Sequence, residues 1–99
     1  MDTLSCYEGI LEVIDETGWN EEENGVENGF IIFSHKKRDN YRMIFAKWGD
    51  DNTNEPGCCV TIDEFEHPRA VYLHLELADE KHPDGALRNA LEEFNTLYV

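Results

Sequence analysis

The sequence predicts an α+β domain in which a four-stranded antiparallel β-sheet carries an N-terminal and a C-terminal helix packed on one face. Apolar residues recur at helical spacing at both ends of the chain, and four short segments between them are rich in β-branched and aromatic residues. Short polar links separate these segments, so consecutive strands are expected to pair as a meander. A chain of 99 residues has the size of a single domain, residues 1–99.

The first helix is expected to begin after Asp2, whose side chain is a good helix cap. One apolar stripe at three- and four-residue spacing contains Leu4, Tyr7, Ile10, Leu11, Val13 and Ile14. Gly18 is well placed to end this helix, because glycine adopts a left-handed backbone conformation that a Cβ disfavours. The segment that follows, residues 19–29 (WNEEENGVENG), is predicted to be a charged loop.

Four strands are predicted: residues 29–35, 41–48, 58–63 and 71–77. The polar segment HKKRDN makes a hairpin natural between the first two. The last strand, VYLHLEL, alternates most regularly, and its valine and leucines are expected to face the core. Tyr72 and His74 are then expected on the opposite, partly exposed face of the sheet.

A C-terminal helix is predicted after Pro83 and Asp84. Its apolar stripe contains Leu87, Ala90, Leu91 and Phe94, followed by Leu97 or Tyr98. Both helices can therefore bury an apolar face against the same side of the sheet.

The composition indicates a strongly negative surface. Twenty-two Asp and Glu oppose eight Lys and Arg, giving a formal charge of −14, whereas a magnitude of ~2 to 8 suffices for the solubility of a small domain. Direct binding to nucleic acid or to an anionic membrane is therefore disfavoured. Half of the basic residues lie close together, at Lys36, Lys37, Arg38 and Arg42, so the rest of the chain is even more acidic.

A cytoplasmic protein is expected. No apolar run approaches the ~18 to 20 residues needed to cross a bilayer, and an acid stands at position two, where a secretory signal would carry basic residues. The cysteines, Cys6, Cys58 and Cys59, are odd in number and two are adjacent, which favours reduced thiols over a disulfide framework.

No metal or other cofactor is predicted. Asp50, Asn52 and Asn54 match the first oxygen ligands of an EF-hand loop, but Glu55 replaces its glycine and Thr61 its final glutamate. The histidines and cysteines lack the paired spacing of zinc motifs. There is no phosphate-binding loop or nucleophile elbow, and nothing in the sequence selects one thiol as a nucleophile, so a binding protein is expected rather than an enzyme.

The charge predicts a function. At one charge per ~1.7 Å of duplex, 14 charges correspond to ~24 Å of DNA. We expect a small acidic intracellular inhibitor that binds a basic partner, either a nuclease or another nucleic-acid-binding protein, as a nucleic-acid mimic. Immunity, anti-restriction and anti-CRISPR proteins act in this way as functional classes. Neither nucleic acid nor a membrane is expected as a direct partner.

The partner-binding residues are predicted from the acidic segments and two neighbouring aromatics: Trp19, Glu21, Glu22, Glu23, Glu27, Asp50, Asp51, Glu55, Asp63, Glu64, Phe65 and Glu66. Aromatic anchors ringed by polar groups carry much of the energy of an interface. Phe65 can instead fold over the edge of the core, and Trp19 can instead fasten the first helix to the sheet.

The alternative function is a protein-binding adaptor or chaperone-like module, with charge serving solubility alone. It would use residues 71–77 or the exposed face of the sheet to hold another protein, or to form a homodimer. Salt distinguishes the two functions, because only charge-driven binding fades as ionic strength rises.

Overall fold

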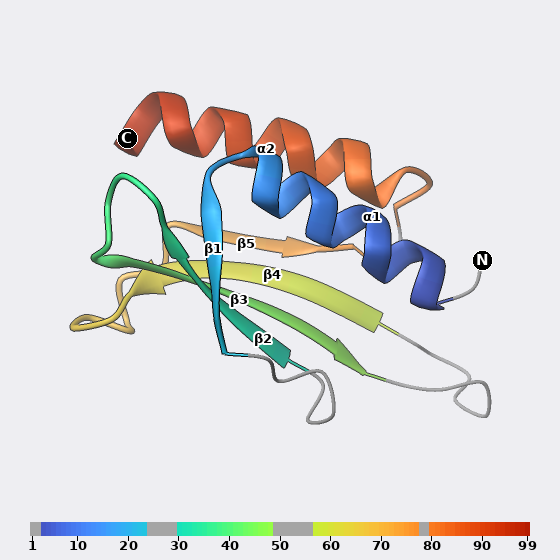
Figure 1. Ribbon diagram of the computed structural model, residues 1–99, viewed down its shortest axis with the longest axis horizontal. Coiled ribbons are helices and arrows are strands. Elements are labelled where there is room, and N and C mark those ends of the chain that lie inside the picture. The colour runs from blue at the N-terminus through green and yellow to red at the C-terminus, as the bar shows by residue number, and fades with distance from the viewer. Residues whose placement is uncertain (1–2, 24–29, 49–56, 78–79) are drawn as a thin grey trace.

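The computed structural model describes residues 3–23, 30–48, 57–77 and 80–99. They form an antiparallel sheet with both helices on one face (Figure 1). The strands lie in chain order, β1-β2-β3-β4-β5. The predicted α+β class and the two terminal helices are confirmed, but the sheet has five strands rather than four.

Helix α1 spans Thr3–Glu16 and ends as predicted. Gly18 has a φ of 100°, and its N–H donates to the carbonyl of Asp15 at 3.2 Å. Ile10, Val13 and Ile14 are at most 3% exposed, so this side of the helix belongs to the core.

The additional strand is β1, Trp19–Glu23, which lies in the segment predicted to be a charged loop. It pairs antiparallel with β2, Phe30–His35, and a β-bulge interrupts the pairing between Glu21 and Glu23. The prediction was wrong because β1 lies at the edge of the sheet. Only Trp19 of its described side chains is buried. The others face solvent and can therefore be polar. The remainder of the predicted loop, residues 24–29, lies outside the described residues.

The predicted hairpin is confirmed by the antiparallel pairing of β2 with β3, Tyr41–Trp48. Strand β3 also pairs with β4, Gly57–Glu64. Phe45 lies between Ile31 and Val60 in this register. All three are at most 1% exposed and face the helices.

Strand β5, Leu73–Glu76, is shorter than the predicted residues 71–77. Val71, expected to face the core, precedes the strand and is 54% exposed. The expectation for Tyr72 was wrong, because its ring packs at centroid distances of 6.4 Å from Phe94 and 5.1 Å from Tyr98, both in α2. Tyr72 precedes the strand, so the alternation that begins at Leu73 does not set its direction. His74 lies within the strand and, as expected, faces away from the helices, beside Thr61.

Helix α2, Pro83–Tyr98, completes the core with Leu87, Leu91 and Phe94, each at most 2% exposed. A proline in the first turn suits a helix start, because the first N–H groups have no partner within the helix. The helices pack against each other and against the same side of the sheet (Figure 1).

A polar network fastens these layers together. Asn95 of α2 donates from Nδ2 to the carbonyl of Thr17 at 2.9 Å, and its Oδ1 lies 3.0 Å from Nε2 of His35. The N–H of Lys37 donates to Nδ1 of His35 at 3.0 Å. Because Nδ1 accepts this bond, the ring proton lies on Nε2 and is donated to Asn95. His35 is 4% exposed and meets the Trp19 ring edge-on.

Candidate functional site

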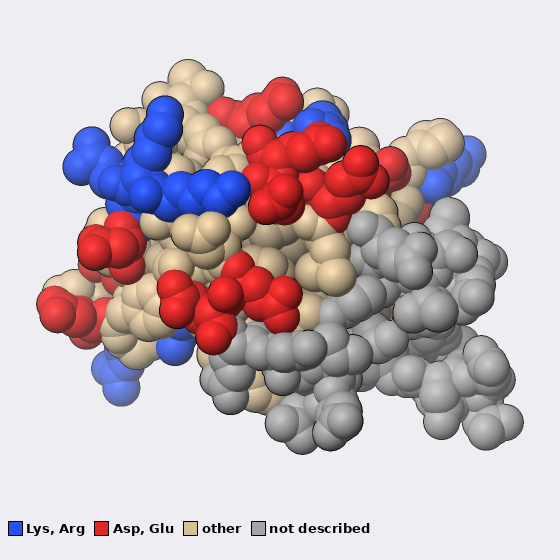
Figure 2. Space-filling view, in the orientation of Figure 1, with Lys and Arg blue, Asp and Glu red and all other residues tan. Residues whose placement is uncertain are grey.

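The acidic surface of α1 and β1 is the first candidate site; we define it by five exposed carboxylates, Glu12, Asp15, Glu16, Glu21 and Glu22. They come from the side of α1 opposite its buried residues and from the edge strand that follows directly in the chain. Figure 2 shows Asp and Glu gathered over α1 and β1. Two adjacent elements thus place their carboxylates on one side of the molecule.

Basic neighbours only partly neutralise this surface. Lys36 Nζ lies 3.5 Å from Asp15 Oδ1, and Arg88 forms an ion pair with Glu16. The pKa of Arg88 is raised, first by its hydrogen bond to Glu16 and by that carboxylate's charge, and further by the charges of Glu92 and Glu12. The single positive charge of Arg88 thus interacts with several carboxylates, and the acidic surface keeps a net negative charge.

The two glutamates of β1 lie at the edge of the sheet. Glu21 and Glu22 are exposed, and Glu22 accepts a hydrogen bond from the hydroxyl of Ser34 in β2. The β-bulge at this point inserts an extra residue into the edge strand. Such a bulge changes the direction in which the neighbouring side chains point. Among the residues with described side chains, neither glutamate forms an ion pair with Lys or Arg.

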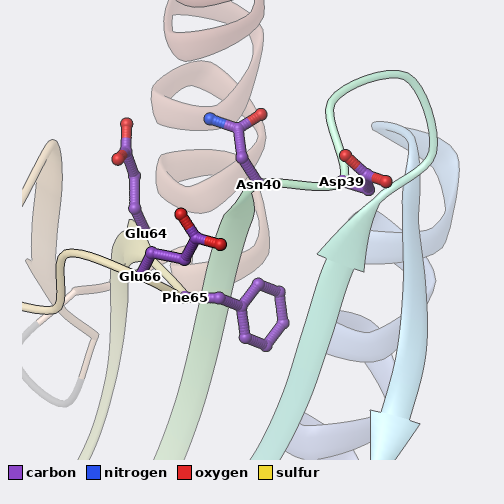
Figure 3. Close-up of a pocket in the computed structure, with 5 residues that line it drawn as sticks. All are labelled: Asp39, Asn40, Glu64, Phe65 and Glu66. Carbon is purple, nitrogen blue, oxygen red and sulfur yellow. The ribbon is translucent and has the colours of Figure 1, made fainter.

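An acidic hollow is the second candidate site (Figure 3). Its lining residues come from the β2–β3 turn and from the end of β4: Asp39, Asn40, Glu64, Phe65 and Glu66. The two segments are joined by a hydrogen bond from the N–H of Phe65 to the carbonyl of Asn40, at 3.1 Å. Three of the predicted partner-binding residues are thus brought beside two that sequence reasoning did not select.

Phe65 gives this hollow an aromatic wall. Its side chain is 43% exposed, and the guanidinium carbon of Arg42 lies 5.9 Å from the ring centroid, within cation–π range. The neighbouring Glu64 accepts a hydrogen bond from the hydroxyl of Tyr72. That bond, followed by burial and the charge of Glu64, raises the pKa of Tyr72 to about 12, so the phenol stays protonated at neutral pH.

Two predicted partner-binding residues are buried instead. Trp19 is 1% exposed and belongs to the core, packed between His35 and Phe94. Asp63 is 4% exposed because Arg42 covers it, with Nε and Nη2 donating to its two oxygens at 2.8 and 2.6 Å. Both are corrections to the predicted site, since neither side chain reaches the surface.

Five further residues were predicted to bind the partner. Glu23 ends β1, and only its backbone is described. The remaining four, Glu27, Asp50, Asp51 and Glu55, lie outside the described residues.

Three basic residues gather at one end of the molecule, where Lys36 borders the acidic surface through its ion pair with Asp15. Lys36, Lys37 and Arg38 are exposed in the β2–β3 turn, and Figure 2 shows a group of Lys and Arg at that end of the molecule. This arrangement agrees with the clustering in the sequence. It concentrates positive charge at one end and leaves the α1–β1 side predominantly acidic.

The face of the sheet away from the helices has a different character. The register places Phe30, Ile32, Ile44, Ala46 and Cys59 on this face, and all are partly exposed. In the described ranges no helix covers it (Figure 1). This face therefore carries a group of partly exposed apolar side chains.

At one border of this face, a thiol, an imidazole and a carboxylate converge. The ligand atoms of Cys59, His74 and Glu76 all lie within 4.8 Å of one another. His74 Nε2 is 3.0 Å from Glu76 Oε1, and its Nδ1 is 3.0 Å from Thr61 Oγ1. Burial, and then the charge of Glu76, raises the pKa of the Cys59 thiol.

Sequence reasoning missed this cluster because it searched for ligand pairs along the chain. Its members are paired across two strands, Cys59 with Glu76 and Thr61 with His74. The available signal was the alternation of Cys-x-Thr in one strand and His-x-Glu in the next. Using it would have required the register between the two strands.

Comparison with known protein families, with curated proteins and with solved structures found no match. None of the helices in the described ranges is both long and apolar enough to cross a membrane.

Proposed function

We propose that this protein is an acidic binding protein, not an enzyme, that occupies the basic surface of a nuclease or another nucleic-acid-binding protein and thereby inhibits it. The observation that supports this proposal is the gathering of carboxylates on one surface, which Lys36 and Arg88 neutralise only in part. Carboxylates gather over α1 and β1, while three of the basic residues lie together in the β2–β3 turn. A groove built to bind phosphates would be attracted to the acidic side.

The placement of the carboxylates favours mimicry of a nucleic acid strand. Glu12, Asp15 and Glu16 stand on a regular helix, and Glu21 and Glu22 on a paired strand, so their backbones are fixed before binding. Charges held in advance lose little conformational entropy on binding. They also steer a basic partner during its approach, which raises the association rate at low ionic strength.

The acidic hollow provides a second contact of suitable chemistry. Phe65 presents an exposed ring, with Asp39 and Glu66 beside it. An exposed aromatic ring in a hollow that is also lined by carboxylates matches an arginine side chain, which stacks on rings and pairs with carboxylates. We infer that arginines of the partner are recognised here.

The proposal is tested by displacement from DNA. Basic proteins from a lysate of the native cells are retained on immobilised duplex DNA, and the purified protein is added as a competitor. It should elute one or a few proteins, identified by mass spectrometry, which then bind it directly. That binding should weaken steeply between about 50 and about 500 mM sodium chloride, because screening shortens the range of the charges.

Matched charge variants locate the surface. Glu21→Gln with Glu22→Gln removes two charges from β1 and should weaken binding of the eluted partner roughly tenfold. The control removes two exposed charges elsewhere, Glu80→Gln with Glu93→Gln. Equal losses in both double variants would mean that net charge alone drives the interaction. Failure to elute any DNA-binding protein would contradict the proposed function.

A second candidate function, a protein-binding adaptor, is favoured by the partly exposed apolar face of the sheet. An adaptor would capture its partner equally well at low and high salt. Ile44 lies near the middle of this face, paired with Ile32 and Thr61. Ile44→Lys should abolish binding by an adaptor and leave binding through the acidic surface unchanged.

A further inference from the structure

We propose that Cys59, His74 and Glu76 form a binding site for one Zn²⁺ ion, with a fourth ligand supplied by water or by another molecule. Thiolate, imidazole and carboxylate are the three ligand types that zinc takes from proteins. Each of the three residues offers one such atom, and the atoms lie within 4.8 Å of one another. This site is separate from the acidic surface of α1 and β1.

The backbone already brings these ligands together. Cys59 and Glu76 are directly opposite each other in β4 and β5, and His74 stands two residues from Glu76 on the same face. Side chains directly opposite in an antiparallel pair have Cβ atoms about 4.5–5.5 Å apart. The ligands are thus held by paired strands rather than by loops, and such sites are better defined.

Small side-chain rotations complete the geometry. Tetrahedral zinc, with bonds of about 2.0–2.3 Å, needs ligand atoms roughly 3.4–3.6 Å apart. His74 Nε2 and Glu76 Oε1 are now 3.0 Å apart, at hydrogen-bond distance. Their side chains are 51% and 54% exposed, which leaves room for the rotations that would admit an ion.

Thr61 orients the imidazole. Its hydroxyl oxygen lies 3.0 Å from Nδ1 of His74, on the side of the ring away from Glu76. When Nδ1–H donates to this oxygen, the lone pair of Nε2 faces Glu76 and is free to bind a metal. A hydrogen bond to the second ring nitrogen is the usual way in which a protein fixes a metal-binding histidine.

The ligand set selects the class of metal. Calcium and magnesium prefer oxygen ligands alone, whereas a thiolate and an imidazole suit zinc and its neighbours in the first transition row. The Cys59 thiol loses its proton to solvent as the sulfur–zinc bond forms. The net charge of −14 adds a general attraction for cations.

The test uses the metal-free, reduced full chain. Zinc is titrated by calorimetry, and Co²⁺ is used as a spectroscopic probe, because a cobalt–thiolate bond gives a charge-transfer band in the near ultraviolet. We expect one Zn²⁺ per chain, the cobalt band, and protection of Cys59 from alkylation, located by fragmentation mass spectrometry. Excess magnesium should not displace the zinc.

Variants assign the ligands. Cys59→Ser should remove the cobalt–thiolate band. His74→Gln and Glu76→Gln should each weaken zinc binding by about tenfold or more. Thr61→Val keeps the shape of the side chain and should weaken binding about 10- to 100-fold through the orientation of His74. His67→Gln and Cys58→Ala are the controls for an imidazole and a thiol outside the site, and both should bind zinc normally.

Circular dichroism of each variant establishes that it is folded. The proposal is overturned if zinc does not bind, if magnesium displaces it, or if Cys59→Ser retains the cobalt–thiolate band. It is also overturned if His67→Gln weakens binding as much as His74→Gln does. The double variant Glu21→Gln with Glu22→Gln should bind zinc as the wild type does, so this result and the test of the proposed function are independent.

Discussion

His35 connects three elements of the fold, β1, β2 and α2. It lies in β2, accepts a hydrogen bond from Lys37, contacts Trp19 of β1 and is hydrogen-bonded to Asn95 of α2. Burial lowers its pKa from the ordinary value of 6.5, and the charges of Lys37 and Arg38 lower it further, against the opposing effect of Asn95. The folded protein thus favours the neutral ring.

The pH dependence of stability follows from this lowered pKa. As pH falls through 6.5, the unfolded chain binds a proton at His35 while the folded protein does not. The free energy of unfolding therefore decreases, until pH reaches the lowered pKa of the folded state. The contribution of His35 is complete above 6.5, and the slope is at most about 1.4 kcal/mol per pH unit for one proton.

Denaturant titrations between about pH 5 and 7 test this prediction on wild type and His35→Gln, with His67→Gln as the control. The wild type should lose more stability on acidification than His35→Gln, and His67→Gln should follow the wild type. An NMR titration of the wild type provides a direct check. A His35 midpoint at or above 6.5 would contradict the account of its burial.

The burial of neighbouring residues near the end of β4 could be predicted from the sequence only in part. The sequence left open whether Phe65 anchors a partner or folds over the edge of the core. Phe65 and Glu66 are exposed in the turn after β4, and Glu64, which ends that strand, is partly exposed. Asp63, one residue earlier, is buried because Arg42 pairs with it across two strands. That partner is 21 residues away in the sequence, so no local pattern separates Asp63 from its exposed neighbours.

At the scale of elements, the connection between α1 and β1 is set by one glycine. Gly18 has a φ of 100°, in a region that residues with a Cβ rarely adopt. An added Cβ would have ordinary contacts, since its nearest neighbour is Nε2 of His35 at 3.6 Å. Gly18→Ala should therefore lower the free energy of unfolding by about 1–2 kcal/mol, through backbone strain alone. Thermal and denaturant unfolding measure this change.

Gly9, inside α1, supplies the control. No positive φ is found there, and an added Cβ would meet only Cβ of Asp84, at 3.9 Å. Gly9→Ala should stabilise the protein by about 0.5–1 kcal/mol, because alanine favours the helix interior. If the two substitutions change stability in the same direction, the conformation assigned to Gly18 is wrong.

Elements with strong periodicity were predictable, and β1 was not. Both helices were expected from their apolar stripes, whereas the Trp-Asn-Glu-Glu-Glu sequence of β1 has no alternation and many residues that strands disfavour. Its pairing with β2 and the burial of Trp19 override that local preference. The acidic hollow was predictable only in part for a related reason, since Asp39 and Asn40 reach it from another turn.

For the whole molecule, charge is the dominant property. A formal charge of −14 is carried by a body with a radius of gyration of 13.0 Å. At 0.1 M salt the screening length is about 10 Å, so carboxylates on neighbouring elements repel one another. This repulsion opposes the compact state. Ion pairs such as Asp15–Lys36 are exposed and offset little of it.

We therefore expect the protein to become more stable as sodium chloride is added. A gain of about 1 kcal/mol between about 0.05 and about 0.5 M would raise the melting temperature by about 4–8 °C for a domain of this size. Calorimetry in the presence of a chelator measures the increase without bound metal. Choline chloride should give the same increase, because screening depends on ionic strength rather than on the identity of the cation.

A variant with fewer charges separates repulsion from other effects of salt. Glu66, Glu80 and Glu93 are exposed and form no ion pair with Lys or Arg in the described part of the chain. Replacing all three with glutamine should raise the melting temperature at low salt and reduce its salt dependence. A wild-type melting temperature that falls with sodium chloride would contradict self-repulsion. An unchanged salt dependence in the variant would show that these carboxylates do not contribute to it.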